Sequence, residues 1–84
     1  MNKAIEAALL EVRIEIDRGA RKHGKFNSAH EGFAVLLEEV DELRSEVWKK
    51  IKLRDPRAMR AEARQVAAIA VRFMLECSNP EKDD

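Results

Sequence analysis

The chain has 84 residues, and its 16 Lys and Arg balance 16 Asp and Glu, so the formal net charge is zero. This balance argues against a bulk attraction to nucleic acid or to an acidic membrane, so neither is expected as a partner. With 45% hydrophobic and 38% charged residues but three Gly and two Pro, the composition indicates one helical domain over 1–84 and excludes a strand-and-turn sandwich. Residues 1–10 do not resemble a secretory signal, and no apolar run approaches the roughly 18 residues of a membrane span, so a cytoplasmic location is expected.

The first predicted helix runs from about Asn2 to about Ala20. Apolar residues recur along it at helical spacing: Ile5, Leu9, Val12 and Ile16. A break over 19–27, which contains two glycines, is expected to separate it from the second helix.

The second predicted helix begins at a capping box of Ser28 and Glu31 and runs from Ala29 to about Arg54. At 1.5 Å per residue it would be about 39 Å long, whereas a compact globule of this size has a diameter of roughly 30 Å. Its apolar stripe comprises Phe33, Leu36, Leu37, Val40, Leu43, Val47 and Ile51. We therefore expect the second and third helices to complete a four-helix bundle with another copy, in a homodimer or homotetramer.

The third predicted helix begins at Asp55, an N-capping residue, followed by Pro56 at the first helical position. It is expected to end at 78–80, which leaves a charged tail over 79–84. Its apolar stripe comprises Met59, Ala63, Val66, Ala70, Phe73, Met74 and Cys77. The predicted fold class is thus all-α, with three main helices per chain.

The second helix also carries an acidic face. Glu39, Glu42 and Glu46 lie together on the side away from Val40, with Glu38 next to Glu42. Such a face can simply be solvated. Four carboxylates within three turns repel one another, however, and a divalent cation or neighbouring bases would relieve that repulsion.

Glu62 falls within the apolar stripe of the third helix, where a carboxylate needs a cation, a hydrogen-bonded base or a raised pKa. Gln65 flanks the same stripe one turn on and supplies a second oxygen. A site that draws Glu39 and Glu42 from one helix, and Glu62 and Gln65 from another, would suit a hard cation such as Mg2+. The alternative is an ordinary buried salt bridge.

These residues resemble the MazG-like all-alpha nucleoside triphosphate pyrophosphohydrolases. That family carries Glu-Glu-x-x-Glu on one helix and Glu-x-x-Asp on the next. Residues 38–42 read Glu-Glu-Val-Asp-Glu, and residues 62–65 read Glu-Ala-Arg-Gln, with Gln65 in place of the usual Asp. The flanking segments 30–34 and 65–72 resemble the small phage and prophage branch of the family.

The resemblance implies Mg2+-dependent hydrolysis, with Mn2+ as the alternative metal, of an NTP or dNTP to the monophosphate and pyrophosphate. It implies Glu39, Glu42, Glu62 and Gln65 as metal ligands. It also implies that Glu38 is a further ligand or a base, so that all four glutamates belong to the catalytic site.

Other side chains are candidates for substrate binding. The basic candidates for phosphate contacts are Lys25, Lys49, Lys52 and Arg72, and Trp48 is a candidate for stacking on a base. Arg72 can instead pair with Glu76 at i+4, and Trp48 can pack into the core.

Two other functions are compatible with the sequence. Because the amide of Gln65 contributes no charge, the protein can be a non-catalytic nucleotide-binding or metal-binding homologue. It can also be a structural helical oligomerisation module in which the acidic face is solvated and Glu62 pairs with a base.

Overall fold

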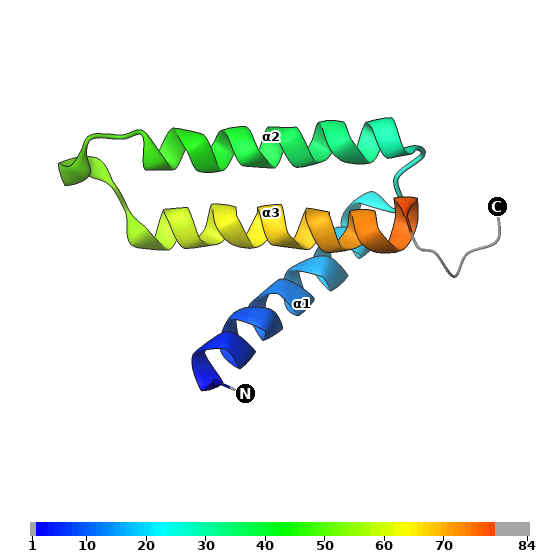
Figure 1. The fold of residues 1–84 in the computed structure, drawn as a ribbon, viewed down its shortest axis with the longest axis horizontal. Coiled ribbons are helices and arrows are strands. Elements are labelled where there is room, and N and C mark those ends of the chain that lie inside the picture. Colours follow the sequence, from blue (N-terminus) through cyan, green and yellow to red (C-terminus); the bar gives the residue numbers. More distant parts are fainter. Residues whose placement is uncertain (1, 79–84) are drawn as a thin grey trace.

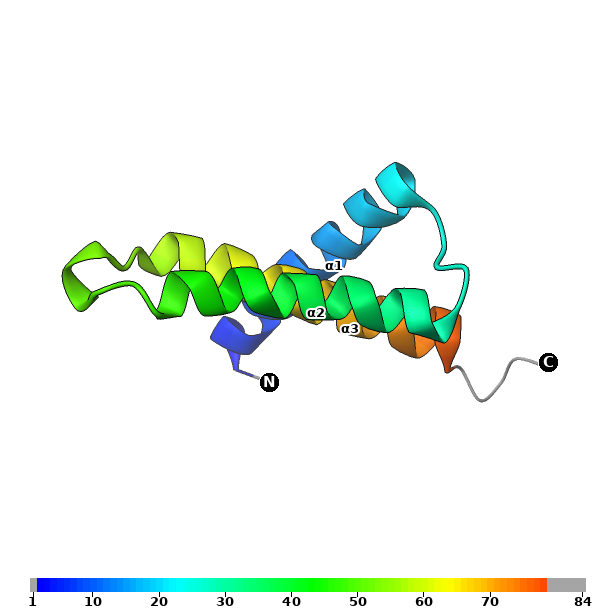
Figure 2. The same ribbon diagram turned by 90° about the horizontal axis from the view of Figure 1, so that it is seen from above.

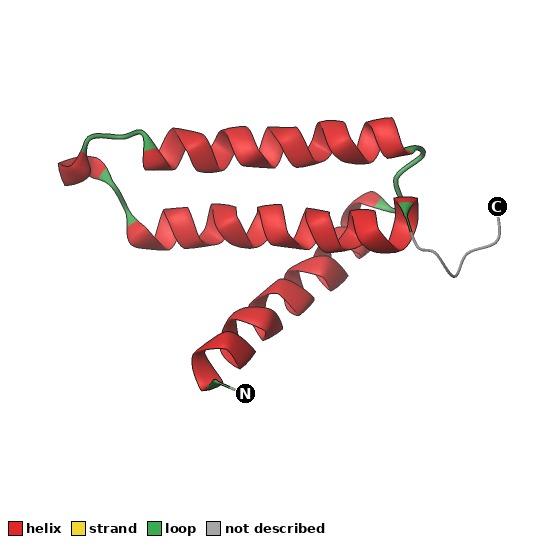
Figure 3. Cartoon of the chain, in the orientation of Figure 1, coloured by secondary structure: helices red, strands yellow, loops and turns green. Residues whose placement is uncertain are grey.

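The computed structural model describes residues 2–78, and within that range the regular elements are all helices. Three long helices, α1 (Lys3–His23), α2 (Ala29–Val47) and α3 (Pro56–Cys77), are joined by short connections, and a single 3-10 turn, η1 (Ile51–Leu53), lies between α2 and α3. Figure 3 shows the same chain coloured by secondary structure. The predicted all-α class with three main helices is confirmed.

Helix α1 is longer than its sequence pattern predicts. It was expected to end near Ala20, but it continues through Gly19 to His23. A glycine inside a helix costs only about 1 kcal/mol, so Gly19 does not terminate the helix. Gly24 does, because its φ of 71° is readily adopted only by a residue without a side chain.

Helix α2 begins where predicted and ends earlier. The Ser28 hydroxyl accepts a hydrogen bond from the Glu31 N–H at 3.1 Å, and the Glu31 carboxylate accepts one from the Asn27 N–H at 2.7 Å. The helix ends at Val47, whose carbonyl oxygen accepts a hydrogen bond from Nε of Arg54 at 2.7 Å. The predicted extension to Arg54 is therefore wrong. With 19 residues α2 is about 28 Å long, so its length no longer argues for a second chain.

Helix α3 begins and ends where the sequence indicates. The Asp55 carboxylate accepts a hydrogen bond from the Arg57 N–H at 2.9 Å, and Pro56 occupies the first helical position. Ser78 caps the other end. The predicted charged tail over 79–84 lies outside the described residues.

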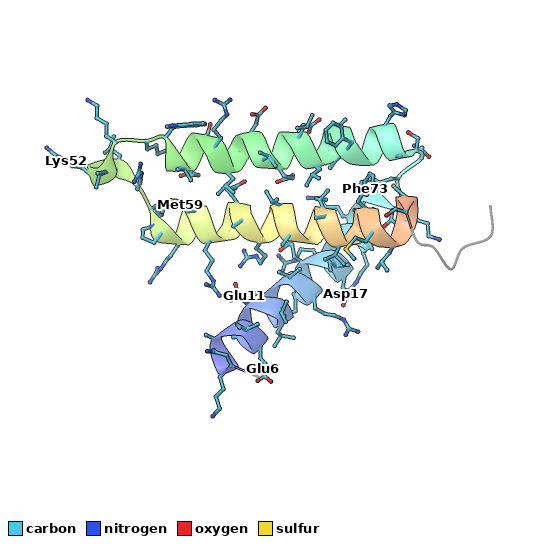
Figure 4. The ribbon with its side chains drawn as sticks, viewed as in Figure 1. Glu6, Glu11, Asp17, Lys52, Met59 and Phe73 are labelled. Atoms are coloured by element: carbon cyan, nitrogen blue, oxygen red, sulfur yellow. The ribbon has the colours of Figure 1, made fainter. Side chains whose placement is uncertain are left out.

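Helix α3 is the centre of the fold. It packs antiparallel against α2 on one side and is crossed by α1 on another, while α1 and α2 do not pack on each other (Figures 1 and 2). The α2–α3 contact is tight at Gly32, where a Cβ atom would lie 2.9 Å from the ring of Phe73. Figure 4 shows Phe73 on the α2 side of α3.

Ion pairs join α1 to α3. Glu11 of α1 accepts hydrogen bonds from Arg60 at 2.6 Å and from Arg64 at 3.0 Å, and it extends toward α3 in Figure 4. Hydrogen bonds from Arg60 and then from Arg64 lower the pKa of Glu11. Glu15, one turn further along, is buried and lies 3.7 Å from Arg64.

Much of the apolar surface remains uncovered. Among the described residues Ala68 is the only buried hydrophobic one, whereas thirteen large hydrophobic side chains are exposed. The predicted stripe of α2 is split, since Leu36 and Leu43 are half-buried. The exposed part of that stripe within α2, termed here the outer stripe, comprises Phe33, Leu37, Val40 and Val47, and Ile51 in η1 is exposed as well. None of the described helices is both long and apolar enough to cross a membrane.

Candidate metal centre

Three of the predicted ligands lie together between α2 and α3. Glu39 and Glu42 project from adjacent turns of α2, Glu62 projects from α3, and one carboxylate oxygen of each lies within 4.8 Å of the others. Glu39 and Glu46 are half-buried, so part of the acidic face of α2 is turned toward α3 and is not fully solvated. The antiparallel pairing of the two helices brings residues 39–42 opposite residue 62.

The surroundings of this cluster disfavour negative charge. Burial, followed by the nearby charge of Glu42, raises the pKa of Glu39 to about 7. Burial also raises the pKa of Glu62, and a hydrogen bond with Glu42 and the charges of Glu42 and Glu46 add to that shift. The cluster therefore holds more carboxylate charge than the surrounding protein compensates.

One oxygen of the cluster is buried without a partner. Oε2 of Glu62 makes no hydrogen bond within the described part of the chain. The base two positions along α3, Arg64, pairs with Glu11 and Glu15 of α1 instead. The salt bridge considered as an alternative for Glu62 is thus not formed within residues 2–78. Three convergent carboxylates, one with an unsatisfied buried oxygen, fit a hard divalent cation.

A cavity of about 570 Å3 adjoins the cluster. The cavity lies between α1 and α2, which do not pack on each other, and it is also lined by residues of α3 and of the connection 24–27. Glu38, Glu39 and Gln65 line it near the cluster. Its volume lies within the range of about 300–1,000 Å3 that is typical of small-molecule sites.

Arg72 lines the cavity but is already engaged. Its side chain is 3% exposed, its Nε donates to Glu76 at 2.9 Å, and its Nη2 donates to the carbonyl oxygen of Gly24. The guanidinium also lies 4.4 Å from the ring centre of Phe26. Burial acts to raise the pKa of Glu76, but the hydrogen bonds from Arg72 and from the Phe26 N–H outweigh it, so the pKa is lowered. Arg72 forms the predicted i+4 pair and anchors the connection between α1 and α2.

The other predicted substrate contacts fall into two groups. Lys25 lines the cavity. Trp48, Lys49 and Lys52 instead lie at the far end of the α2–α3 hairpin, where Figure 4 labels Lys52, and they do not line it. Trp48 is 72% exposed, so the alternative prediction that it packs into the core is wrong. Lys49 donates to Glu46 at 2.9 Å.

Two cavity-lining bases escaped the sequence analysis. Arg18 and Lys22 line the cavity from the last turns of α1. Lys22 was missed because the helix was expected to end near Ala20, which placed this residue in a loop, whereas Arg18 lay within the predicted helix but no sequence motif singled it out. Their i, i+4 spacing would have identified them once α1 was continued to His23.

No protein-family model, curated protein or solved structure matches the chain.

Proposed function

We propose that the chain is a Mg2+-dependent nucleoside triphosphate pyrophosphohydrolase, which converts an NTP or dNTP into the monophosphate and pyrophosphate. The observation that carries this proposal is the unpartnered buried oxygen of Glu62 beside Glu39 and Glu42, at the edge of a cavity of suitable size for a nucleotide. The resemblance of residues 38–42 and 62–65 to the MazG-like motifs agrees with it. We place this activity in the cytoplasm.

The residues divide the chemistry between them. Glu39, Glu42, Glu62 and Gln65 would hold Mg2+, or Mn2+ in its place, and a bound ion would offset the charge of the triphosphate and lower the pKa of a water. Glu38 is exposed and lines the cavity beside the cluster, where its carboxylate accepts the proton of the attacking water. Lys25 lines the same cavity, and its proposed role is to contact a phosphate.

The active form that we propose is a homodimer or homotetramer. The accessible surface of 6804 Å2 exceeds the roughly 5,100 Å2 expected of a compact monomer of this mass. The radius of gyration of 14.3 Å likewise exceeds the expected value of about 12 Å. Packing the outer stripe against a second copy would complete a four-helix bundle.

Replacing Glu62 tests the activity. Glu62→Gln keeps the shape of the side chain but removes its charge, so pyrophosphate release from nucleoside triphosphates should fall at least 100-fold, because transition-state charge is no longer offset at the centre. The assay measures pyrophosphate and monophosphate with Mg2+, and with EDTA as the metal-free reference. The matched control is Glu6→Gln, on the exposed surface of α1 (Figure 4). Equal rates for Glu62→Gln and the parent would overturn the proposal.

Gln65 favours a second candidate, a protein that binds metal and nucleotide without turnover. An amide oxygen ligates a hard cation but adds no charge, so Gln65→Asp should strengthen Mg2+ binding about tenfold. Calorimetric titration of both proteins with Mg2+ measures this, and the control is Asn2→Asp, an amide-to-carboxylate change outside the cavity that keeps the oxygen accepting from the Ala4 N–H. Binding without product release from the parent would favour this candidate. Unchanged affinity in Gln65→Asp would remove position 65 from the ligand set.

A further inference from the structure

The cavity between α1 and α2 is lined by charged residues of both signs. Four are acidic and four are basic: Glu15, Glu31, Glu38 and Glu39, and Arg18, Lys22, Lys25 and Arg72. The acids nearest the candidate metal centre are Glu38 and Glu39 of α2, whereas Arg18 and Lys22 line the opposite wall, on α1. A ligand in this cavity therefore has carboxylates on one side and bases on the other.

Several of these side chains already have partners. Arg72 is held by Glu76, Glu31 by Asn27, and Glu15 by Arg64 as well as by Arg18. Lys22 forms no ion pair within residues 2–78.

Arg18 retains unused donors. It donates one hydrogen bond, from Nη1 to Glu15 at 3.2 Å, and its side chain is 66% exposed. A guanidinium carries five N–H donors, so Arg18 has several left for a ligand. Because Arg18 and Lys22 are four residues apart on one helix, their side chains project from the same face.

We infer that Arg18 and Lys22 bind the phosphate groups of a polyphosphate ligand that spans the cavity from α1 to the carboxylate cluster. The inference rests on the proposed function for the identity of the ligand. It adds to that function two substrate-binding residues on α1, a helix that carries none of the substrate-binding residues predicted from the sequence. Because α1 and α2 do not pack on each other, such a ligand would also link the two helices.

The test is the binding of inorganic tripolyphosphate, measured by calorimetry in the presence of Mg2+. The double variant Arg18→Gln, Lys22→Gln should bind about tenfold more weakly, as expected for two solvent-accessible charge-assisted contacts. The matched control Lys3→Gln, Arg13→Gln removes the same charge from exposed positions of α1 that do not line the cavity, and should bind as the parent does. The swap Arg18→Lys, Lys22→Arg keeps both positive charges, so it should weaken binding less than the double Gln variant does, by about threefold at most.

Three results would overturn the inference: equal binding by the double variant and the parent, equal weakening in the control variant, or no binding of tripolyphosphate to the parent. Lys22→Gln alone is measured as well, because it disturbs no ion pair within the described residues and so tests the contact without risk to folding.

Pyrophosphate release from nucleotides is followed in parallel, with KM and kcat separated. A raised KM with little change in kcat is expected of the double variant. If the parent binds tripolyphosphate with the predicted variant effects but releases no pyrophosphate from nucleotides, the proposed function fails while this inference stands. If nucleotides are hydrolysed equally well by the double variant, the inference alone fails.

Discussion

Glu62 illustrates how a single residue can reveal a site. It interrupts the apolar stripe of α3, and that irregularity was visible in the sequence before any partner was known. The structure places it beside Glu39 and Glu42, with one oxygen buried and unpartnered. Its partners followed from the i, i+3 spacing of the two glutamates on one helix. How deeply Glu39 and Glu62 are buried depends on tertiary packing, so it could not be predicted from the sequence.

Glu39 should make the stability of the metal-free protein depend on pH. Its pKa is raised from 4.5 to about 7 in the folded chain, because the buried site favours the protonated carboxyl. The contribution of Glu39 to the free energy of unfolding is therefore fully present below its unfolded pKa of 4.5 and is lost as the pH rises through about 7. Thermal melting in EDTA should therefore show a Tm that falls on the order of 5 °C between about pH 5 and about pH 8.

Glu39→Gln should remove much of this dependence, since it eliminates the titrating group, whereas Glu6→Gln should keep it. A Tm that falls as steeply in Glu39→Gln as in the parent would show that burial of this carboxylate is not the cause. The pKa of Glu76 is lowered, so this residue has the opposite effect on stability. It stabilises the fold at pH values above its unfolded pKa of 4.5, and this stabilisation is lost as the pH falls below that value.

At the scale of the helices, the α2–α3 contact depends on Gly32. A Cβ atom there would lie 2.9 Å from Phe73, 3.1 Å from Phe26 and 3.2 Å from Sγ of Cys77. These distances are shorter than ordinary van der Waals contacts, so a larger side chain would push α2 away from α3. The same displacement would separate Glu39 and Glu42 from Glu62.

A pair of glycine substitutions tests that contact. Gly32→Ala should lower the free energy of unfolding by about 1 kcal/mol, because crowding outweighs the gain in helix propensity. Gly19→Ala should raise it by about 0.5–1 kcal/mol, since its Cβ atom would lie at an ordinary 3.7 Å from Arg72. Urea denaturation measures both. Similar stabilities for the two variants would contradict the close approach at Gly32.

The ends of the helices were less predictable than their beginnings. Ser28 and Asp55 cap their helices through neighbouring N–H groups, so the sequence alone located both starts. The end of α2 at Val47 involves the side chain of Arg54, seven residues away, and no local pattern signals that contact. The position of Lys22 on a cavity wall was missed for a related reason, because α1 was expected to end near Ala20 but ends at His23, before Gly24.

At the scale of the whole molecule, the outer stripe and the cavity lie on different sides of α2. The outer stripe comprises Phe33, Leu37, Val40 and Val47, whereas α2 lines the cavity with Glu31, Val35, Glu38 and Glu39. The helical pattern predicted the stripe as one apolar surface, but α3 covers only part of it. A second copy packed on the outer stripe would leave the cavity open.

Light scattering tests this arrangement. The parent at micromolar concentration should have at least twice the mass of one chain, because burial of the outer stripe favours association. Leu37→Glu should shift it to the monomer, since a carboxylate would then have to be buried at the contact. Ser45→Glu adds the same charge at an exposed position of α2 outside the outer stripe, so this variant should keep the mass of the parent. A monomeric parent would contradict the proposed oligomer.

The separation of α1 from α2 has a consequence for how this protein can diversify. The carboxylate cluster is built entirely by α2 and α3, while one wall of the cavity belongs to α1, which meets only α3. Under the proposed function, substitutions on this wall would change which ligands the cavity accepts and leave the candidate metal ligands in place, so related chains that share the α2–α3 hairpin are expected to differ most in the last turns of α1.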